Sequence, residues 1–266
     1  MGGMAEWGRE QFAGSFSIEG CDPEKQEAVI NEKAFDGGFW SVERITHRMK
    51  NGSPALKQHL AFVSVPDEGI AVLFDHAVAV SNIRVNSQEG LKFRLPNDIW
   101  NDGKQEIAGP KGKITLWGSD NTTKAPVDGG TYILSVPWIS MDGKLSFIAL
   151  SSNSPFTARD SLEGDFLDLP YITEPHDFHT DGLVRYSVVV LAAGGKRTAG
   201  NISKHSKLVS SGNPNVKCAL VSPDGKRKWM VSVNLSAIPA AVKIDSDGHI
   251  ASFDIGPMSA DIRCLK

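Results

Sequence analysis

Short strand-like segments bounded by turn residues follow one another along most of this chain, and this repetition restricts its fold class more than any other feature. Apolar and polar residues alternate over residues 38–48 and again over 56–65, and the dipeptide Asp142-Gly143 separates two further strand-like runs. Asp-Gly between such runs is a strong hairpin signal. Short strands with a turn every 8–12 residues are typical of a β-sandwich or barrel. The sequence therefore predicts an all-β protein, with its 26 glycines and 14 prolines supplying many of the turns.

Two segments are too apolar to lie at a surface. Residues 70–80 and 183–193 are nearly continuous apolar runs, so we expect strands that are buried on both faces. Asp75 and His76 interrupt the first run. A buried carboxylate needs a partner, and His76 itself or His59 on the neighbouring strand can supply one. We interpret this group as structural, with a catalytic role as the alternative.

The order of these segments predicts two β domains. We expect a large antiparallel β-sandwich over residues 36–195, a polar linker over 196–214 and a small β-sandwich over 215–266. The linker has a composition that allows a short helical turn. The small unit has about 50 residues and would be marginal alone, so it should pack on the larger one. The N-terminal segment 1–35 is expected to hold one short helix.

The predicted helix covers residues 23–33. Asp22 can cap its first turn, Pro23 suits the first helical position, and the glycines at 37 and 38 follow its end. Almost everything after this segment is typical of strands and turns.

Composition excludes several classes of function. The 28 Lys and Arg residues against 31 Asp and Glu residues leave a net charge of -3, so we expect no nucleic-acid partner. No apolar run approaches the roughly 20 residues of a membrane span, and the first residues lack the pattern of a signal peptide. The three cysteines form neither a disulfide framework nor a zinc motif. No cofactor or metal motif occurs, and we expect neither group.

One polar cluster contains residue types suited to acid–base chemistry. Glu174, His176 and His179 lie within six residues just before the apolar run at 183–193. Histidines alternating with acids can bind a metal or act as a general acid and base. The alternative is a solvated polar loop leading into the strand.

A second cluster has the residue types that bind sugars, namely Asn97, Asp98, Trp100 and Asn101. Amide and carboxylate groups hydrogen-bond to hydroxyls, and an indole face packs on a pyranose ring. The alternative is an Asx-rich turn with one anchoring tryptophan. Trp138, beside the Asp-Gly hairpin, is a further candidate platform for a sugar, and packing in the core is the alternative that we favour for it.

Three stretches resemble the C-terminal β region of polysaccharide lyases and glycoside hydrolases. The turn at 66–69 before the apolar strand, the run 138–145 (WISMDGKL), and the run 229–235 followed by 255–259 are similar to segments of their supersandwich and closing sandwich domains. Ser140 and Ser146 stand where the lyase pattern has Asn and Gly, and no catalytic residue is carried over. In such enzymes an upstream domain holds most of the catalytic machinery.

The resemblance implies an accessory role. We expect the chain to be the β part of a larger carbohydrate-active enzyme, supporting a catalytic domain, contacting an oligo- or polysaccharide, and located outside the cytoplasm in the parent protein. One alternative is a stand-alone supersandwich sugar enzyme, aldose epimerase-like or a lyase, that uses Glu174 with His176 or His179. Another is a binding module for a glycan or a partner protein.

Overall fold

The computed structural model describes residues 16–23, 29–31, 38–88, 92–94, 104–109, 112–117, 131–133, 137–141, 144–150, 157–159, 166–168, 174–246 and 249–265. These residues form strands, a single α-helix, α1 (Lys196–His205), and a 3-10 turn, η2 (Pro66–Glu68). Every strand pair in them is antiparallel. The prediction of an all-β sandwich fold is therefore confirmed.

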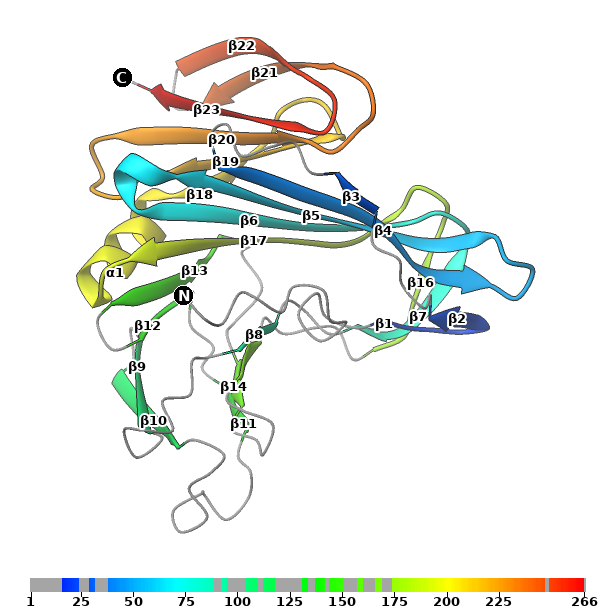
Figure 1. Ribbon diagram of the computed structural model, residues 1–266, viewed down its shortest axis with the longest axis horizontal. Coiled ribbons are helices and arrows are strands. Elements are labelled where there is room, and N and C mark those ends of the chain that lie inside the picture. The colour runs from blue at the N-terminus through cyan, green and yellow to red at the C-terminus, as the bar shows by residue number, and fades with distance from the viewer. Residues whose placement is uncertain are drawn as a thin grey trace.

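A ten-stranded sheet, which we call the main sheet, forms the centre of the molecule (Figure 1). Its strand order is β10-β9-β12-β13-β17-β6-β5-β4-β2, and β3 pairs with β4. The strands are β2 (Cys21–Pro23), β3 (Val29–Asn31), β4 (Phe39–Met49), β5 (Pro54–Val65), β6 (Ile70–Ala79), β9 (Lys104–Gly109), β10 (Gly112–Trp117), β12 (Trp138–Met141), β13 (Leu145–Ala149) and β17 (Leu183–Ala193).

Smaller sheets surround the main sheet. A three-stranded sheet has the order β1-β7-β16, and a four-stranded sheet has the order β11-β14-β15-β8. Near the C-terminus a second four-stranded sheet, β18-β19-β20-β23, lies next to the hairpin β21-β22. Their strands are β1 (Phe16–Ile18), β7 (Ile83–Gln88), β8 (Lys92–Arg94), β11 (Thr131–Ile133), β14 (Thr157–Arg159), β15 (Phe166–Asp168), β16 (His176–Phe178), β18 (Lys207–Val209), β19 (Val216–Val221), β20 (Lys228–Asn234), β21 (Ala240–Ser246), β22 (His249–Ile255) and β23 (Ser259–Leu265).

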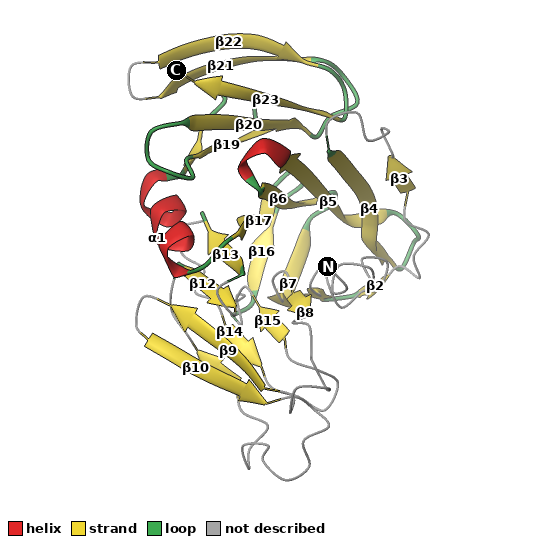
Figure 2. Cartoon of the chain, turned by 60° about the vertical axis from the view of Figure 1, so that its left-hand side comes forward, coloured by secondary structure: helices red, strands yellow, loops and turns green. Residues whose placement is uncertain are grey.

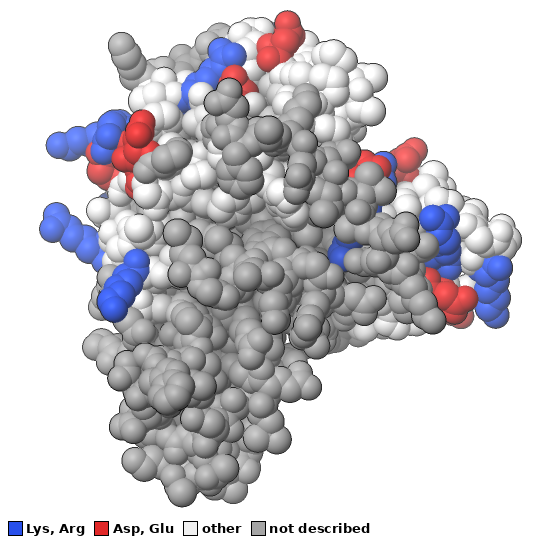
Figure 3. Space-filling view, in the orientation of Figure 1, with Lys and Arg blue, Asp and Glu red and all other residues white. Residues whose placement is uncertain are grey.

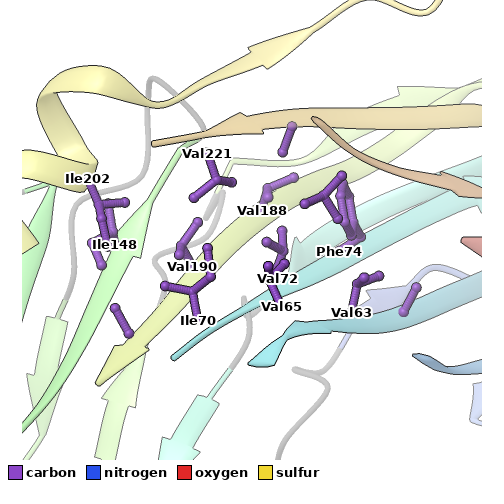
Figure 4. Packing of buried hydrophobic residues seen from close by; sticks show 14 of the residues in the cluster. Val63, Val65, Ile70, Val72, Phe74, Ile148, Val188, Val190, Ile202 and Val221 are labelled. Carbon is purple, nitrogen blue, oxygen red and sulfur yellow. The ribbon is translucent and has the colours of Figure 1, made fainter. Parts of the chain in front are cut away.

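The C-terminal sheet and the main sheet share one hydrophobic core. Val63, Val72 and Val188 of the main sheet belong to the same buried cluster as Val221 and Val231 of the C-terminal sheet. Figure 4 shows the labelled valines of both sheets lying between the strands. The residues that we predicted as a separate small unit therefore bury one face of β19 and β20 against the larger one.

A second cluster lies on the outer side of the C-terminal sheet. It joins Cys218, Leu220 and Met230 to Val242 and Phe253 of the hairpin β21-β22. Figures 1 and 2 show the result as three layers, with the main sheet below, the C-terminal sheet above it and the hairpin outermost. We call the face of the main sheet that the C-terminal sheet covers the upper face, and the opposite one the lower face.

The predicted N-terminal helix is wrong for the part of its range that the structure describes, residue 23 and residues 29–31. Val29–Asn31, within the predicted range, forms β3 and pairs with Glu43, Val42 and Ser41 of β4. Pro23 ends strand β2, which also pairs with β4. The exposed backbone of a long neighbouring strand thus prevails over local capping signals.

The α-helix lies instead in the segment that we predicted as a linker. In α1, Ala199 and Ile202 are fully buried and belong to the core between the sheets. These positions are three apart and therefore lie on one face of a helix. None of the helices in the described ranges is long and apolar enough to cross a membrane.

Candidate functional site

The structure does not bring the predicted acid–base residues together. Glu174, His176 and His179 are all exposed, and no hydrogen bond, ion pair or ring contact joins any of these three described residues to another. The ring of His176 packs against Phe178, with the centroids 4.9 Å apart. The segment forms strand β16 and the turn that leads into β17, which agrees with the alternative of a solvated polar connection.

The predicted sugar-binding residues have two different outcomes. Asn97, Asp98, Trp100 and Asn101 lie outside the described residues. Trp138 is only 7% exposed and packs in the core beside α1, where its ring approaches Gly200. Its burial agrees with the alternative of packing in the core.

The pair Asp75-His76 leads to polar groups on both faces of the main sheet. Successive residues of a strand point to opposite faces, so Asp75 faces the lower side and His76 the upper side. Each belongs to a row of polar side chains that crosses the adjacent strands β4, β5, β6 and β17. The sequence indicated that Asp75 needs a partner, but the partner is neither histidine that we considered.

The arginine row, on the lower face, consists of Arg44, Gln58, Asp75 and Arg185. Nε and Nη2 of Arg44 both donate to Oε1 of Gln58, at 2.9 and 2.7 Å. Nε2 of Gln58 donates to Oδ1 of Asp75 at 2.7 Å. Oδ2 of Asp75 lies 2.6 Å from Nε of Arg185. Each of the three links is direct, so the four side chains fix one another in place.

Burial differs along the arginine row. Gln58 and Asp75 are fully buried and Arg185 is 8% exposed, whereas Arg44 is only half-buried. The guanidinium carbon of Arg185 lies 4.3 Å from the ring centroid of Phe16 in β1. Arg44 is therefore the end of the row that solvent reaches.

Two aromatic side chains share the lower face with Arg44. The register pairs Trp40 with Phe62 and Arg44 with Gln58, and residues two apart on a strand lie on the same face. Both aromatic side chains are half-buried. Four residues of extended chain place the Trp40–Phe62 pair about 13 Å from Arg44, which is the span of a short oligosaccharide rather than of one sugar.

The histidine row, on the upper face, consists of Glu43, His59, His76 and Tyr186. The register places them opposite one another on four adjacent strands. Oε2 of Glu43 lies 2.8 Å from Nε2 of His59. The rings of His59 and His76 have centroids 6.2 Å apart, as do those of His76 and Tyr186.

Burial and neighbouring charges set the protonation of this row. Desolvation, followed by the charges of Lys217, His59 and Lys57, lowers the pKa of His76 to about 3. Desolvation also raises the pKa of the Tyr186 phenol. The hydrogen bond from His59 lowers the pKa of Glu43 despite partial burial. At neutral pH the row thus contains an ionised Glu43, an uncharged His76 and an uncharged Tyr186.

No group of three or more His, Cys, Asp or Glu residues in the described ranges is arranged to hold a metal ion.

Cys218 and Cys264 are free, and they lie on the strands β19 and β23 that flank β20. On the face drawn in Figure 3, described basic and acidic side chains lie next to each other.

Comparison with known proteins adds little to this geometry. No family model matches the chain, and no curated protein matches it. A search of solved structures found a likeness to the α-galactosidase from Lactobacillus brevis, with a TM-score of 0.40 and 9% identity over 72% of this chain and 29% of that chain. The chain spans less than a third of the length of that protein. Because a TM-score of 0.40 does not establish a common fold, the function must be inferred from the residues of this chain.

Proposed function

We propose that this chain is an accessory β region of a carbohydrate-active enzyme, a polysaccharide lyase or a glycoside hydrolase, and that it contacts glycan through the lower face of the main sheet. The observation that carries the proposal is the arginine row, which holds the half-buried Arg44 in one orientation. Catalysis would be supplied by another domain, which this region supports.

The arrangement of Arg44 suits a hydroxyl-rich or carboxylate ligand. Its guanidinium is oriented by Gln58, which is held by Asp75, which is in turn held by Arg185. A side chain that is already ordered loses less conformational entropy on binding. A guanidinium presents several donors in a fixed fork, which matches paired oxygens of a sugar or a uronate carboxylate.

The aromatic pair adds the second element of sugar recognition. The apolar face of a pyranose packs on aromatic rings, and Trp40 and Phe62 lie on the same face as Arg44. The predicted residues Asn97, Asp98, Trp100 and Asn101 remain part of the proposal as further sugar contacts. The alternative of acid–base chemistry by Glu174 with His176 or His179 has no comparable support, because these side chains are exposed and separate.

A binding experiment tests the proposal. Affinity electrophoresis against a panel of neutral and acidic polysaccharides, followed by calorimetry with oligosaccharides of the best one, should reveal a glycan ligand. Arg44→Ala should weaken binding at least about tenfold, because one charge-assisted hydrogen bond contributes about 1.5–3 kcal/mol, and Arg44→Lys should fall between.

The matched control is Arg84→Ala, which removes an exposed arginine paired with Asp177 at 3.0 Å on a different sheet. It should leave glycan binding unchanged. Binding to no polysaccharide of the panel, or equal loss in Arg44→Ala and Arg84→Ala, would overturn the proposal.

A further inference from the structure

The histidine row contains buried hydrogen-bonding capacity that the described protein does not use. Nδ1 of His59 and Nδ1 of His76 are both buried and have no hydrogen-bond partner. His59 is only 4% exposed, so bulk solvent does not reach its ring. Leaving such a group unsatisfied costs about 1–3 kcal/mol, and a buried unsatisfied group in a folded protein often marks the position of a bound ion or water.

The surroundings of His76 are positively charged. Lys217 of β19 and Lys57 of β5 both act on His76 electrostatically. Nζ of Lys217 lies 5.3 Å from the ring centroid of Tyr186 and donates to the carbonyl of Pro214 at 2.8 Å. Partial burial of the Lys217 ammonium lowers its pKa.

The one described carboxylate of the row is already engaged. Glu43 contacts His59 at 2.8 Å and Lys57 at 3.8 Å, and it stands at the far end of the row from Tyr186. The end that contains His76, Tyr186 and Lys217 therefore combines a cation, a phenol and an imidazole. These groups donate hydrogen bonds to an anionic oxygen, and charge-assisted bonds of this kind are the strong ones.

We propose that this end of the histidine row binds an oxyanion, namely a carboxylate, sulfate or phosphate group, through Lys217 with donors from His76 and Tyr186. An uncharged His76 contributes one N–H, and binding of the anion fixes which ring nitrogen holds the proton. The site lies on the upper face of the main sheet, opposite the arginine row, and it does not depend on the glycan function proposed for that row.

Nitrogen-15 NMR of the histidine side chains tests the proposal directly. Titration with sodium glucuronate, sulfate and phosphate, each against chloride at equal ionic strength, should give saturable shifts of His59 and His76 and none of the exposed His176. Glucose serves as the uncharged control for glucuronate. A preference among the three anions identifies the natural source as an acidic sugar, a sulfate ester or a phosphate ester.

Two variants locate the site. Lys217→Met keeps the length of the side chain but removes its charge, and it should raise the Kd at least about tenfold. Lys243→Met, an exposed lysine on β21, should not change it. His76→Phe should abolish saturable binding. If His76→Phe does not fold, the Kd of Lys217→Met compared with that of Lys243→Met tests the proposal.

Three results would overturn the proposal. One is the absence of saturable shifts with all three anions. Another is a shift of His176 that equals those of His59 and His76, which would show binding without a site. The third is an equal effect of Lys217→Met and Lys243→Met on the Kd.

Discussion

Replacing Asp75 by Asn changes one charge at the centre of the arginine row while keeping the shape of the side chain. Asp75 is fully buried, and its two oxygens accept from Gln58 at 2.7 Å and contact Arg185 at 2.6 Å. Gln58 donates an N–H to Asp75, and the guanidinium of Arg185 forms an ion pair with it. The Asn amide therefore places its own donor against one of them and no longer balances the buried guanidinium.

The expected loss of stability is large. Breaking a buried ion pair from one side costs about 3–5 kcal/mol, and the contact of Arg185 with the Phe16 ring compensates for only part of it. For a chain of this size, 1 kcal/mol lowers the Tm by about 2–4 °C. We therefore expect Asp75→Asn to lower the Tm by roughly 6–20 °C.

Urea unfolding and differential scanning calorimetry measure this loss. Asp177→Asn is the matched control, because its pair with Arg84 is exposed on both sides and such pairs contribute about 0–1 kcal/mol. The double variant Asp75→Asn/Arg185→Met should recover part of the loss, since it removes the guanidinium together with the carboxylate of this ion pair. Equal effects of Asp75→Asn and Asp177→Asn, or no recovery in the double variant, would refute this reasoning.

Three further changes have defined outcomes. The pKa of His76 is about 3 against an ordinary 6.5, so the unfolded state binds the proton more readily than the folded state. The free energy of unfolding therefore falls as the pH drops below 6.5 toward 3. His76→Phe should flatten this part of the pH dependence in urea titrations, and an unchanged slope would contradict the prediction. The two N–H groups of the buried Asn234 amide lie within hydrogen-bond distance of three backbone carbonyls, so one hydrogen is shared. Asn234→Ala should therefore lose about 2–4 kcal/mol in the same assay. A loss below about 1 kcal/mol would show that these bonds are replaced. A Cβ at Gly38 would lie 2.7 Å from the Cβ of Ser64, whereas a Cβ at Gly52 would meet nothing within 4 Å. Both glycines have a positive φ, so the two substitutions differ only in the steric contact. Gly38→Ala should therefore lower the Tm clearly more than Gly52→Ala, and equal effects would contradict this prediction.

The apolar runs of the sequence predicted the centre of the fold well. β17 spans the predicted residues 183–193, and β6 spans 70–79 of the predicted 70–80. Val188, Val189 and Val190 are all fully buried, because the C-terminal sheet covers one face of β17 and the other face is also buried. A continuous apolar run needs cover on both faces, so this property can be predicted without knowing what provides the cover.

The helices could not be predicted in the same way. Residues 23–33 contain good capping signals, but Val29–Asn31 hydrogen-bond to β4, and a tertiary contact of this kind is invisible in local sequence. Conversely, among the side chains of α1 that the structure describes, only Ala199 and Ile202 are buried, which is too weak an apolar stripe to stand out. Packing against β12 and β13 compensates for that weakness.

The polar rows depend on strand register, which the sequence does not specify between distant segments. The need of Asp75 for a partner followed from the chain alone, but Arg185 lies in a strand reached only after several other strands. His59 was correctly expected on the neighbouring strand, and it faces His76 rather than Asp75. Alternation decides this point, since a histidine that pairs in register with His76 lies on the opposite face from Asp75.

Neither polar row is needed to hold the main sheet together. The strands that carry them already bury apolar side chains on both faces, and well-packed apolar residues in place of Asp75 and Arg185 would be at least as stabilising, because removing charges from water costs several kcal/mol. This expectation agrees with the proposals that the two rows bind ligands. If each face binds its own ligand, Arg44→Ala should weaken glycan binding and leave oxyanion binding intact, and Lys217→Met should do the reverse. Loss of both in either variant, with native far-UV circular dichroism, would mean that the two faces do not act independently.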